Sequence, residues 1–315
     1  MMRGLAGRAT MRGMPSIQTG AESFSADGGP VGVLVCHGFT GSPRTVRPWA
    51  EHLAAAGFTV RAPRLPGHGT TWQDLNTTGW PDWYSTVEHA FDELSGRCQR
   101  VFVAGLSMGA CLAFRLAETK GDAVSGLVAV NPSLAPDTRL FVLAPVLKHI
   151  VPSLAGIAGD IKKQGGDEGG YTRVPVKAAA TLPALWKLTT RHLSEVSQPV
   201  LVYRSTVDHV VGPASMRILR AALPSAEVRP LRDSYHVATL DNDAPEIFEG
   251  TEAFIAQNTP QGASGGLVAP AQGGSEGLVT PAQGGREGLV APNGGPGVAP
   301  RANRDAADDS SEKRV

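Results

Sequence analysis

The chain has 315 residues, of which 42% are hydrophobic, and its 29 basic and 29 acidic side chains leave no formal net charge. This length suits one large α/β domain with extensions, and the balanced charge argues against a nucleic acid or an anionic membrane surface as a partner. The cysteines, Cys36, Cys98 and Cys111, lack metal-ligand spacing and are odd in number, so we expect thiols in a reducing cytoplasm rather than disulfides.

The N-terminal segment, residues 1–22, carries Arg3, Arg8 and Arg12 but lacks the apolar core of a secretory signal. We expect it to be a flexible extension that precedes the ordered domain. No apolar run approaches the roughly 18–20 residues that span a bilayer, so we expect no integral membrane segment and a cytoplasmic location.

Strands and helices are predicted to alternate through the first part of the domain. The run 31–38 is short, apolar and rich in β-branched residues, as a buried parallel strand is. Residues 43–57 follow with apolar side chains at helical spacing. The next strand is predicted at 58–63, and a single apolar stripe over 80–95 predicts the next helix.

The alternation continues to residue 257. Further strands are predicted at 100–105, 124–133, 198–205 and 226–232, and further helices at 108–118 and 244–257. Strands that alternate with helices indicate a parallel sheet covered on both faces. The expected fold is therefore a mostly parallel, doubly wound α/β domain over residues 23–258.

One interval, residues 133–197, is far longer than a crossover between two strands requires, and it contains the Gly-rich stretch IKKQGGDEGGY. An insert that starts at the carboxyl end of a strand lies where such sheets bind ligands, so we expect a small cap over the site. An apolar stripe early in this insert either packs the cap helix or lines an acyl pocket. It comprises Leu134, Leu140, Phe141, Val142, Leu143, Leu147 and Ile150.

The C-terminal segment, residues 259–315, differs in composition from the domain. Leu267, Leu278 and Leu289 recur in units that carry proline and paired glycines, which excludes a continuous helix. Such units cannot bury enough apolar surface to offset the entropy of ordering, so we expect a disordered Gly/Pro-rich tail. A dispensable tail and a tether to a partner both stay open.

The sequence Gly105-Leu106-Ser107-Met108-Gly109 joins a predicted strand to a predicted helix. The turn between them has to be sharp, and the flanking glycines let neighbouring backbone approach closely. Ser107 then lies at a helix N-terminus, whose N–H groups favour developing negative charge. The G-x-S-x-G pattern is weak by itself, but in this context it indicates that Ser107 is a nucleophile.

A serine hydroxyl needs a base to remove its proton, and the base needs an acid to fix its tautomer. His236 follows the last predicted strand and precedes the last helix, which suits a base carried on a loop. Asp208 comes just after another strand and is the expected acid. Asp233, which is close to His236 in the chain, is its rival.

A tetrahedral intermediate also requires N–H donors for its oxyanion. We expect one donor from Met108, the residue after the nucleophile, and the other from Phe39, in the loop after the first strand. His37 is expected to brace that loop. His68 lies between two glycines, and we expect it in a loop packed beneath the site, without a catalytic role.

The motifs HGFTGSP, LPGHG, GLSMGA, DHVVGP and SYHVATLD, in this order, resemble those of the α/β-hydrolase superfamily, and most of all its bacterial carboxylesterase and monoacylglycerol lipase branch. The resemblance covers residues 31–257 and implies the α/β-hydrolase fold. It also implies Ser107 as the nucleophile, Asp208 as the acid, His236 as the base, and Phe39 and Met108 as the oxyanion donors. Ala110 stands where this branch often has glycine, and the cap segment carries no motif that matches.

The resemblance further implies a serine hydrolase that cleaves short- to medium-chain carboxylic esters or monoacylglycerols through an acyl-enzyme, with no metal and no organic cofactor. A thioesterase or another serine acyl hydrolase would use the same residues, because all these reactions pass through a similar oxyanion. A non-catalytic binding scaffold with this fold is the alternative from another class. The partner expected is a small acyl ester, and the oligomeric state stays open.

Overall fold

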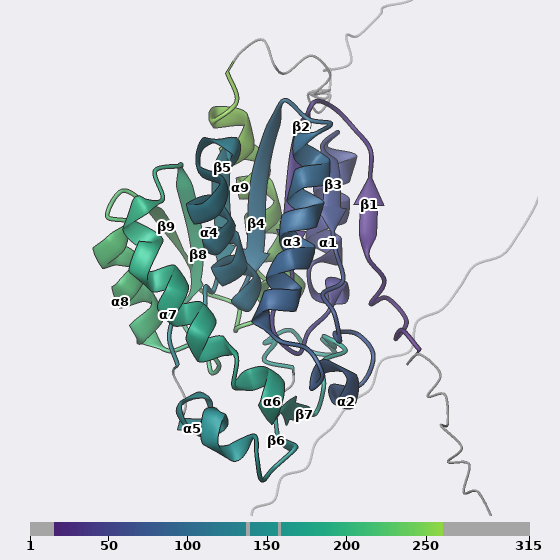
Figure 1. Cartoon of the computed structure of the whole chain (residues 1–315). Coiled ribbons are helices and arrows are strands. Elements are labelled where there is room, and N and C mark those ends of the chain that lie inside the picture. The colour runs from purple at the N-terminus through teal and green to yellow at the C-terminus, as the bar shows by residue number, and fades with distance from the viewer. Residues whose placement is uncertain (1–15, 137–138, 157–158, 261–315) are drawn as a thin grey trace, which may run out of the picture. The chain divides into compact units, whose positions relative to one another are not determined.

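The structure is a computed structural model that describes residues 16–136, 139–156 and 159–260. A seven-stranded sheet with the order β1-β3-β2-β4-β5-β8-β9 lies at its centre (Figure 1). Only β1 runs antiparallel to its neighbour, so the predicted mostly parallel α/β-hydrolase sheet is confirmed. The strands are Phe24–Ala26 (β1), Val31–Cys36 (β2), Thr59–Ala62 (β3), Arg100–Leu106 (β4), Gly126–Val130 (β5), Val200–Ser205 (β8) and Glu227–Leu231 (β9).

Helices cover both faces of the sheet, which is why its central strands are almost continuously apolar. Alternate residues of β2 enter different cores: Leu34 packs on one face and Val33 on the other. Figure 1 shows α3, α4, α7 and α8 on one side of the sheet and α1 and α9 on the other. These helices are Arg47–Ala55 (α1), Trp80–Ser95 (α3), Met108–Lys120 (α4), Leu182–His192 (α7), Pro213–Ala222 (α8) and Ala244–Gln257 (α9).

The predicted strands and helices are present, and most differences are at their ends. The predicted helix 43–57 is divided into a 3₁₀ turn, Pro43–Thr45, and α1, which has a proline in its first turn. Outside the insert, and apart from short 3₁₀ turns, three elements of the described chain have no counterpart among the predictions: β1, α8 and the one-turn helix α2, Trp72–Leu75. Two of them are very short, and short elements carry little periodic signal.

The long insert forms a small substructure at the carboxyl ends of the strands, at the lower end of Figure 1. Its last helix, α7, returns to the main body, where Thr189 lies 3.6 Å from the Cys111 thiol of α4. The other elements are α5, Arg139–Leu147; the antiparallel pair β6, Ser153–Ala155, and β7, Arg173–Pro175; and α6, Val176–Ala179.

Both ends of the chain extend beyond the described residues. Of the predicted tail, only Thr259 and Pro260 are among the described residues, and the rest lies outside them. Residues 1–15 of the predicted N-terminal extension also lie outside the described residues. The described part of that extension contacts the domain: the backbone N–H of Gln18 donates to the carbonyl of Gly69 at 2.8 Å. Within the described ranges, no helix has both the length and the hydropathy needed to cross a bilayer.

Candidate active site

Ser107 lies between β4 and α4 with φ 57° and ψ −116°, a backbone conformation that few non-glycine residues adopt. The residue is 9% exposed and lines a cavity between the sheet and the cap. Such strain persists only where the surroundings over-determine it, and it clusters at functional sites. The turn therefore holds the hydroxyl at the cavity wall.

The two glycines that flank Ser107 explain how so tight a turn forms. A Cβ on Gly109 would lie 2.2 Å from the carbonyl oxygen of Cys36, and a Cβ on Gly105 would lie 2.4 Å from the carbonyl carbon of Gly109. Both distances are far inside van der Waals contact. Because backbone cannot move aside as a flexible side chain can, the turn requires glycine at both positions.

The structure brings His236 against Asp208. The imidazole Nδ1 lies 3.0 Å from a carboxylate oxygen of Asp208, whose side chain is fully buried. Since the carboxylate accepts, Nδ1 carries the hydrogen and Nε2 is left with its lone pair. The rival carboxylate, Asp233, is 59% exposed and pairs with the Lys162 ammonium at 2.6 Å.

The carboxylate of Asp208 is well satisfied. It accepts hydrogen bonds from the backbone N–H groups of Val210 and Val211 at 2.9 and 2.8 Å, and from the Arg204 guanidinium at 2.7 Å. Burial acts to raise the pKa of Asp208. The hydrogen bond and charge of His236, the Val211 N–H and the Arg204 charge outweigh burial, so the pKa lies below its ordinary value and Asp208 stays ionised.

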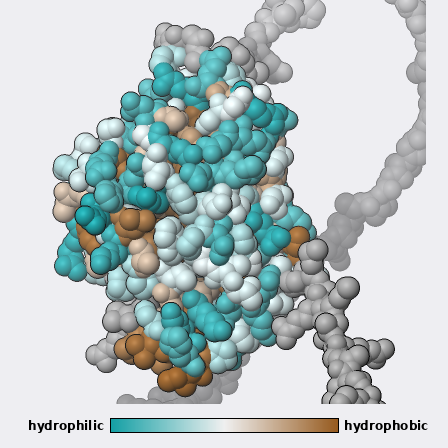
Figure 2. Space-filling view, in the orientation of Figure 1, coloured by the Kyte–Doolittle hydropathy of each residue, from teal (hydrophilic) through white to brown (hydrophobic). Residues whose placement is uncertain are grey.

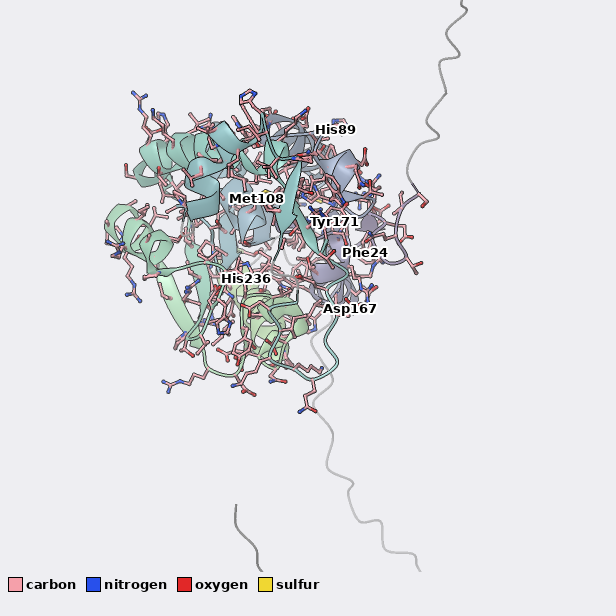
Figure 3. The ribbon with its side chains drawn as sticks, turned by 90° about the horizontal axis from the view of Figure 1, so that it is seen from below. Phe24, His89, Met108, Asp167, Tyr171 and His236 are labelled. Carbon is pink, nitrogen blue, oxygen red and sulfur yellow. The ribbon has the colours of Figure 1, made fainter. Side chains whose placement is uncertain are left out.

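Ser107 and His236 line the same cavity. Among the described residues, no hydrogen bond joins the Ser107 hydroxyl to the imidazole. Such contacts are often long in the absence of substrate and tighten in the complex. Figure 3 shows the site from below, with His236 and the neighbouring Met108 near the middle of the view.

Phe39 and Met108, the expected oxyanion donors, line the cavity beside Ser107. Met108 is the first residue of α4, so its N–H has no acceptor within the helix. Among the described residues, neither the Phe39 N–H nor the Met108 N–H donates a hydrogen bond to a backbone carbonyl in another part of the chain. No hydrogen bond of either N–H is found among the described residues, which is compatible with the expected role as oxyanion donors.

His37 and His68 lie at the loop after β2, which carries Phe39. His37 Nδ1 donates to the carbonyl of Gly38 at 2.9 Å, and its Nε2 accepts from the Leu65 N–H at 3.2 Å, so the ring joins two loops. Burial lowers the pKa of His37 to about 4 and that of His68 well below its usual value. His68 is fully buried and packs edge-on against the ring of Trp83 at 5.2 Å between centroids. Both imidazoles are thus neutral structural groups near pH 7.

The cavity has a volume of about 270 Å³ and a mainly apolar wall. Of the two roles left open for the apolar stripe early in the insert, lining an acyl pocket does not hold for the residues whose side chains are described. Leu134 lies in the main core, Leu147 packs beside α6, and Leu143 and Ile150 are exposed. Figure 2 shows hydrophobic surface at the lower, cap end of the molecule. The apolar wall is instead built by Phe39, Met108, Ala135, Ala155, Val174, Leu182, Trp186, Val210, Val211 and Val237.

Sequence reasoning missed three polar residues at the site, Asn131, Asp160 and Glu168. Asn131 has φ 45° at the end of β5, and its amide donates to Ser205 at 2.9 Å and to the carbonyl of His236 at 2.8 Å. Its place directly after a buried strand was the available signal. Asp160 and Glu168 line the cavity from the Gly-rich part of the insert, where no periodicity marks a residue as functional.

Glu168 gives the cavity an acidic side. One of its oxygens accepts from the Gly159 N–H at 2.6 Å, and the other has no partner among the described residues. Burial raises the pKa of Glu168, and the nearby Asp160 and Asp167 charges raise it further, against the opposing effects of the Gly159 hydrogen bond and the His236 charge. The described residues contain no group of three or more His, Cys, Asp or Glu side chains that would hold a metal ion.

Comparison with known proteins gives consistent matches. Residues 31–243 match the family described as serine aminopeptidase, S33. The chain is 40% identical over 245 residues to the thermostable monoacylglycerol lipase of Bacillus sp. (strain H-257), covering 77% of this chain and 97% of that protein. It is 24% identical over 238 residues to a carboxylesterase of Bacillus subtilis (strain 168), covering 74% of this chain and 96% of that protein.

Solved structures agree with these matches. A structure reported for LipS and LipT, two metagenome-derived lipolytic enzymes, superposes with a TM-score of 0.74 at 36% identity, over 77% of this chain and 100% of that one. The monoacylglycerol lipase of Paleococcus ferrophilus superposes with a TM-score of 0.63 at 21% identity, over 75% of this chain and 98% of that one. The second likeness concerns the fold alone.

Proposed function

Because the chain belongs to the serine aminopeptidase S33 family of α/β-hydrolases, we propose that it is a serine hydrolase that cleaves short- to medium-chain carboxylic esters, monoacylglycerols among them. The curated relatives are named monoacylglycerol lipase and carboxylesterase, and both are carboxylic ester hydrolases. Carboxylic ester hydrolysis is therefore the activity of this chain. The catalytic residues, the acyl-enzyme and the chain length are proposals.

In the proposed reaction, Nε2 of His236 takes the proton of the Ser107 hydroxyl while Oγ attacks the ester carbonyl carbon. Asp208 keeps the hydrogen on Nδ1 and stabilises the imidazolium that forms. The N–H groups of Phe39 and Met108 donate to the oxyanion. The imidazolium then gives its proton to the leaving alcohol, and water cleaves the acyl-enzyme by the same route, which releases the acid and restores the serine.

One observation carries this proposal: a strained serine and a carboxylate-bound imidazole line one apolar cavity. A serine held only for packing needs no φ of 57°. A histidine held only for packing needs no open Nε2 on the wall that Ser107 shares. The backbone strain at Ser107 costs folding free energy whether or not the residue is catalytic, and strain of this kind clusters at functional sites.

The shape and polarity of the cavity support the substrate class. A volume of about 270 Å³ is small for a ligand site, which favours short to medium acyl chains. The apolar wall suits an acyl chain, and the Glu168 oxygen that has no partner among the described residues suits a hydroxyl of glycerol. Glu168→Gln replaces a charged acceptor by a neutral amide. We expect this variant to raise KM for monoacylglycerol several-fold and to leave KM for p-nitrophenyl butyrate unchanged.

A fluorophosphonate probe tests the proposed nucleophile. The intact protein should take one label at Ser107, and Ser107→Ala should take none while keeping its melting temperature. Turnover should then be compared across a p-nitrophenyl ester series, monoacylglycerols, an acyl thioester and an aminoacyl p-nitroanilide. An optimum below about twelve carbons, with esters preferred over thioester and anilide, supports the proposal. Absence of label and of a burst with p-nitrophenyl butyrate would favour the binding scaffold.

We also propose a cytoplasmic location, an α/β-hydrolase domain over 23–258 and a disordered tail. Free cysteines support the location: Cys36 and Cys111 are buried, and burial raises the pKa of each thiol to about 12. Such thiols are unreactive and form no disulfide. Deleting residues 261–315 should leave kcat unchanged, whereas altered localisation of the truncated protein would identify the tail as a tether.

A further inference from the structure

One segment of the cap insert, residues 159–163, is fastened to the loop between β9 and α9 that carries His236. We call it the strap. Its backbone N–H groups at Lys162 and Lys163 donate to the buried carboxylate of Asp241 at 2.7 and 2.8 Å. The strap therefore has a defined position relative to the loop of the proposed base.

Within the strap, the carboxylate of Asp160 accepts three hydrogen bonds. One oxygen accepts from the ring Nδ1 of His209 at 2.7 Å, and the other accepts from the backbone N–H of His209 at 3.1 Å and of His236 at 3.2 Å. His209 directly follows Asp208 in the chain. The Asp160 side chain, only 9% exposed, thus connects the loop of the proposed acid to the loop of the proposed base.

We propose that Asp160 is a positioning residue that holds the two loops at the separation required by the hydrogen bond between Asp208 and His236. The inference rests on the proposed function, because it presumes that this pair acts on Ser107. The two loops follow different strands, β8 and β9, so no local turn sets the distance between them. A carboxylate suits the task because all three of its partners are N–H donors and its bonds to them are charge-assisted.

Asp160 lines the cavity, but its contacts distinguish it from a substrate-binding group. Both of its oxygens are engaged by protein donors, whereas Glu168 keeps one oxygen without a protein partner among the described residues. In Asp160→Asn, all three bonds lose their charge assistance. The amide nitrogen can replace a contact only at the ring Nδ1 of His209, and only after that imidazole changes tautomer; in the other amide orientation the nitrogen faces the two backbone N–H donors and those contacts are lost. A misplacement of about 1 Å at reacting atoms lowers the rate by roughly 10²-fold.

The test compares Asp160→Asn with a matched control, Asp233→Asn. Asp233 also fastens the strap, through its exposed ion pair with Lys162, and no hydrogen bond or ion pair among the described residues joins it to the Asp208 loop. We expect Asp160→Asn to lower kcat on p-nitrophenyl butyrate by about 30- to 100-fold with KM changed less than about threefold. The control should keep its kcat within about twofold. A kcat of Asp160→Asn near that of the wild type, or a KM that rises as much as kcat falls, would overturn the proposal.

A second variant covers the case in which Asp160→Asn does not fold. His209→Ala removes only the ring contact, from a side chain that is 53% exposed, so the fold should tolerate it. A fall in kcat of about three- to tenfold at an unchanged melting temperature supports the proposal, and an unchanged kcat contradicts it. Fluorophosphonate labelling distinguishes failure of the proposed function from failure of the positioning role. A wild-type protein that takes no label rejects the proposed function itself. Equal labelling rates in wild type and Asp160→Asn reject only the role of Asp160.

Discussion

Replacing Asp208 by asparagine tests the proposed acid with little change in shape. The asparagine carbonyl oxygen can still accept the N–H groups of Val210 and Val211, at the positions where the carboxylate now accepts them at 2.9 and 2.8 Å. The amide nitrogen then faces the imidazole of His236. As a donor, it favours the tautomer with the hydrogen on Nε2, and that nitrogen can no longer take the proton of Ser107.

The expected magnitude follows from that tautomer change. A wrongly protonated imidazole lowers kcat by about 10⁴-fold in a triad of this geometry, which corresponds to about 5 kcal/mol in the activation free energy. The amide also replaces the carboxylate that pairs with Arg204 at 2.7 Å. Leaving that largely buried guanidinium without its carboxylate should lower the free energy of unfolding by roughly 1–3 kcal/mol.

The assay is steady-state hydrolysis of p-nitrophenyl butyrate at pH 7.5, with the unfolding transition of each variant measured by circular dichroism. Asp233→Asn is the matched control, because Asp233 was the rival acid and pairs with Lys162 instead. We expect it to retain kcat within about twofold. The reasoning is refuted if Asp208→Asn keeps more than a tenth of the wild-type kcat, and Asp233 becomes the acid if its own variant is the inactive one.

Two further predictions concern folding. Gly109→Ala should abolish the folded state, because its Cβ would lie 2.2 Å from the carbonyl oxygen of Cys36. The control is Gly96→Ala, whose Cβ would lie 3.5 Å from its nearest neighbouring atom and which should keep a cooperative thermal unfolding transition. Similar unfolding transitions in the two variants would contradict this prediction. Burial raises the pKa of Glu118 from 4.5 to about 7, despite its hydrogen bond from Arg115. The folded state therefore binds the proton of Glu118 more tightly than the unfolded state does, and the protein loses stability as pH rises from about 4.5 to 7. Glu118→Gln should therefore be more stable than the wild type by up to about 3 kcal/mol in urea unfolding at pH 8, with most of that difference absent at pH 4.5; an equal difference at both pH values would contradict the assignment.

The contact between Asp208 and His236 shows what the residues near His236 in the sequence do not reveal, which is the position of its partner in space. Two aspartates were candidates for the partner of His236, and the nearer one in sequence was the one without the contact. Asp208 reaches His236 because β8 and β9 are adjacent and parallel, so their carboxyl-end loops meet. That adjacency depends on strand pairing between distant segments and leaves no mark on either loop.

The role of the apolar stripe in the insert stayed open in the sequence for a related reason. An apolar stripe at helical spacing shows that a helix has a face to bury, but not which neighbour covers it. Leu134 is buried in the main core, whereas half of the Leu143 surface stays exposed. The cavity wall came instead from residues scattered over the oxyanion loop, the cap and the loops after β8 and β9.

Local periodicity and turn chemistry by themselves determined the alternation of strands and helices, the sharp turn at Ser107 and the set of candidate side chains. These features depend on residues a few positions apart, whose spacing is written directly in the chain. The place of Asp208 after a strand indicated it as the acid, but only the tertiary structure showed its contact with the imidazole and showed that Asp160 and Asn131 bind the loop of His236. The contacts of Asp160 and Asn131 with His236 join residues that are 76 and 105 positions apart. Their geometry follows from the packing of the whole sheet and cap, because side-chain hydrogen bonds form only where the fold has already brought donor and acceptor together.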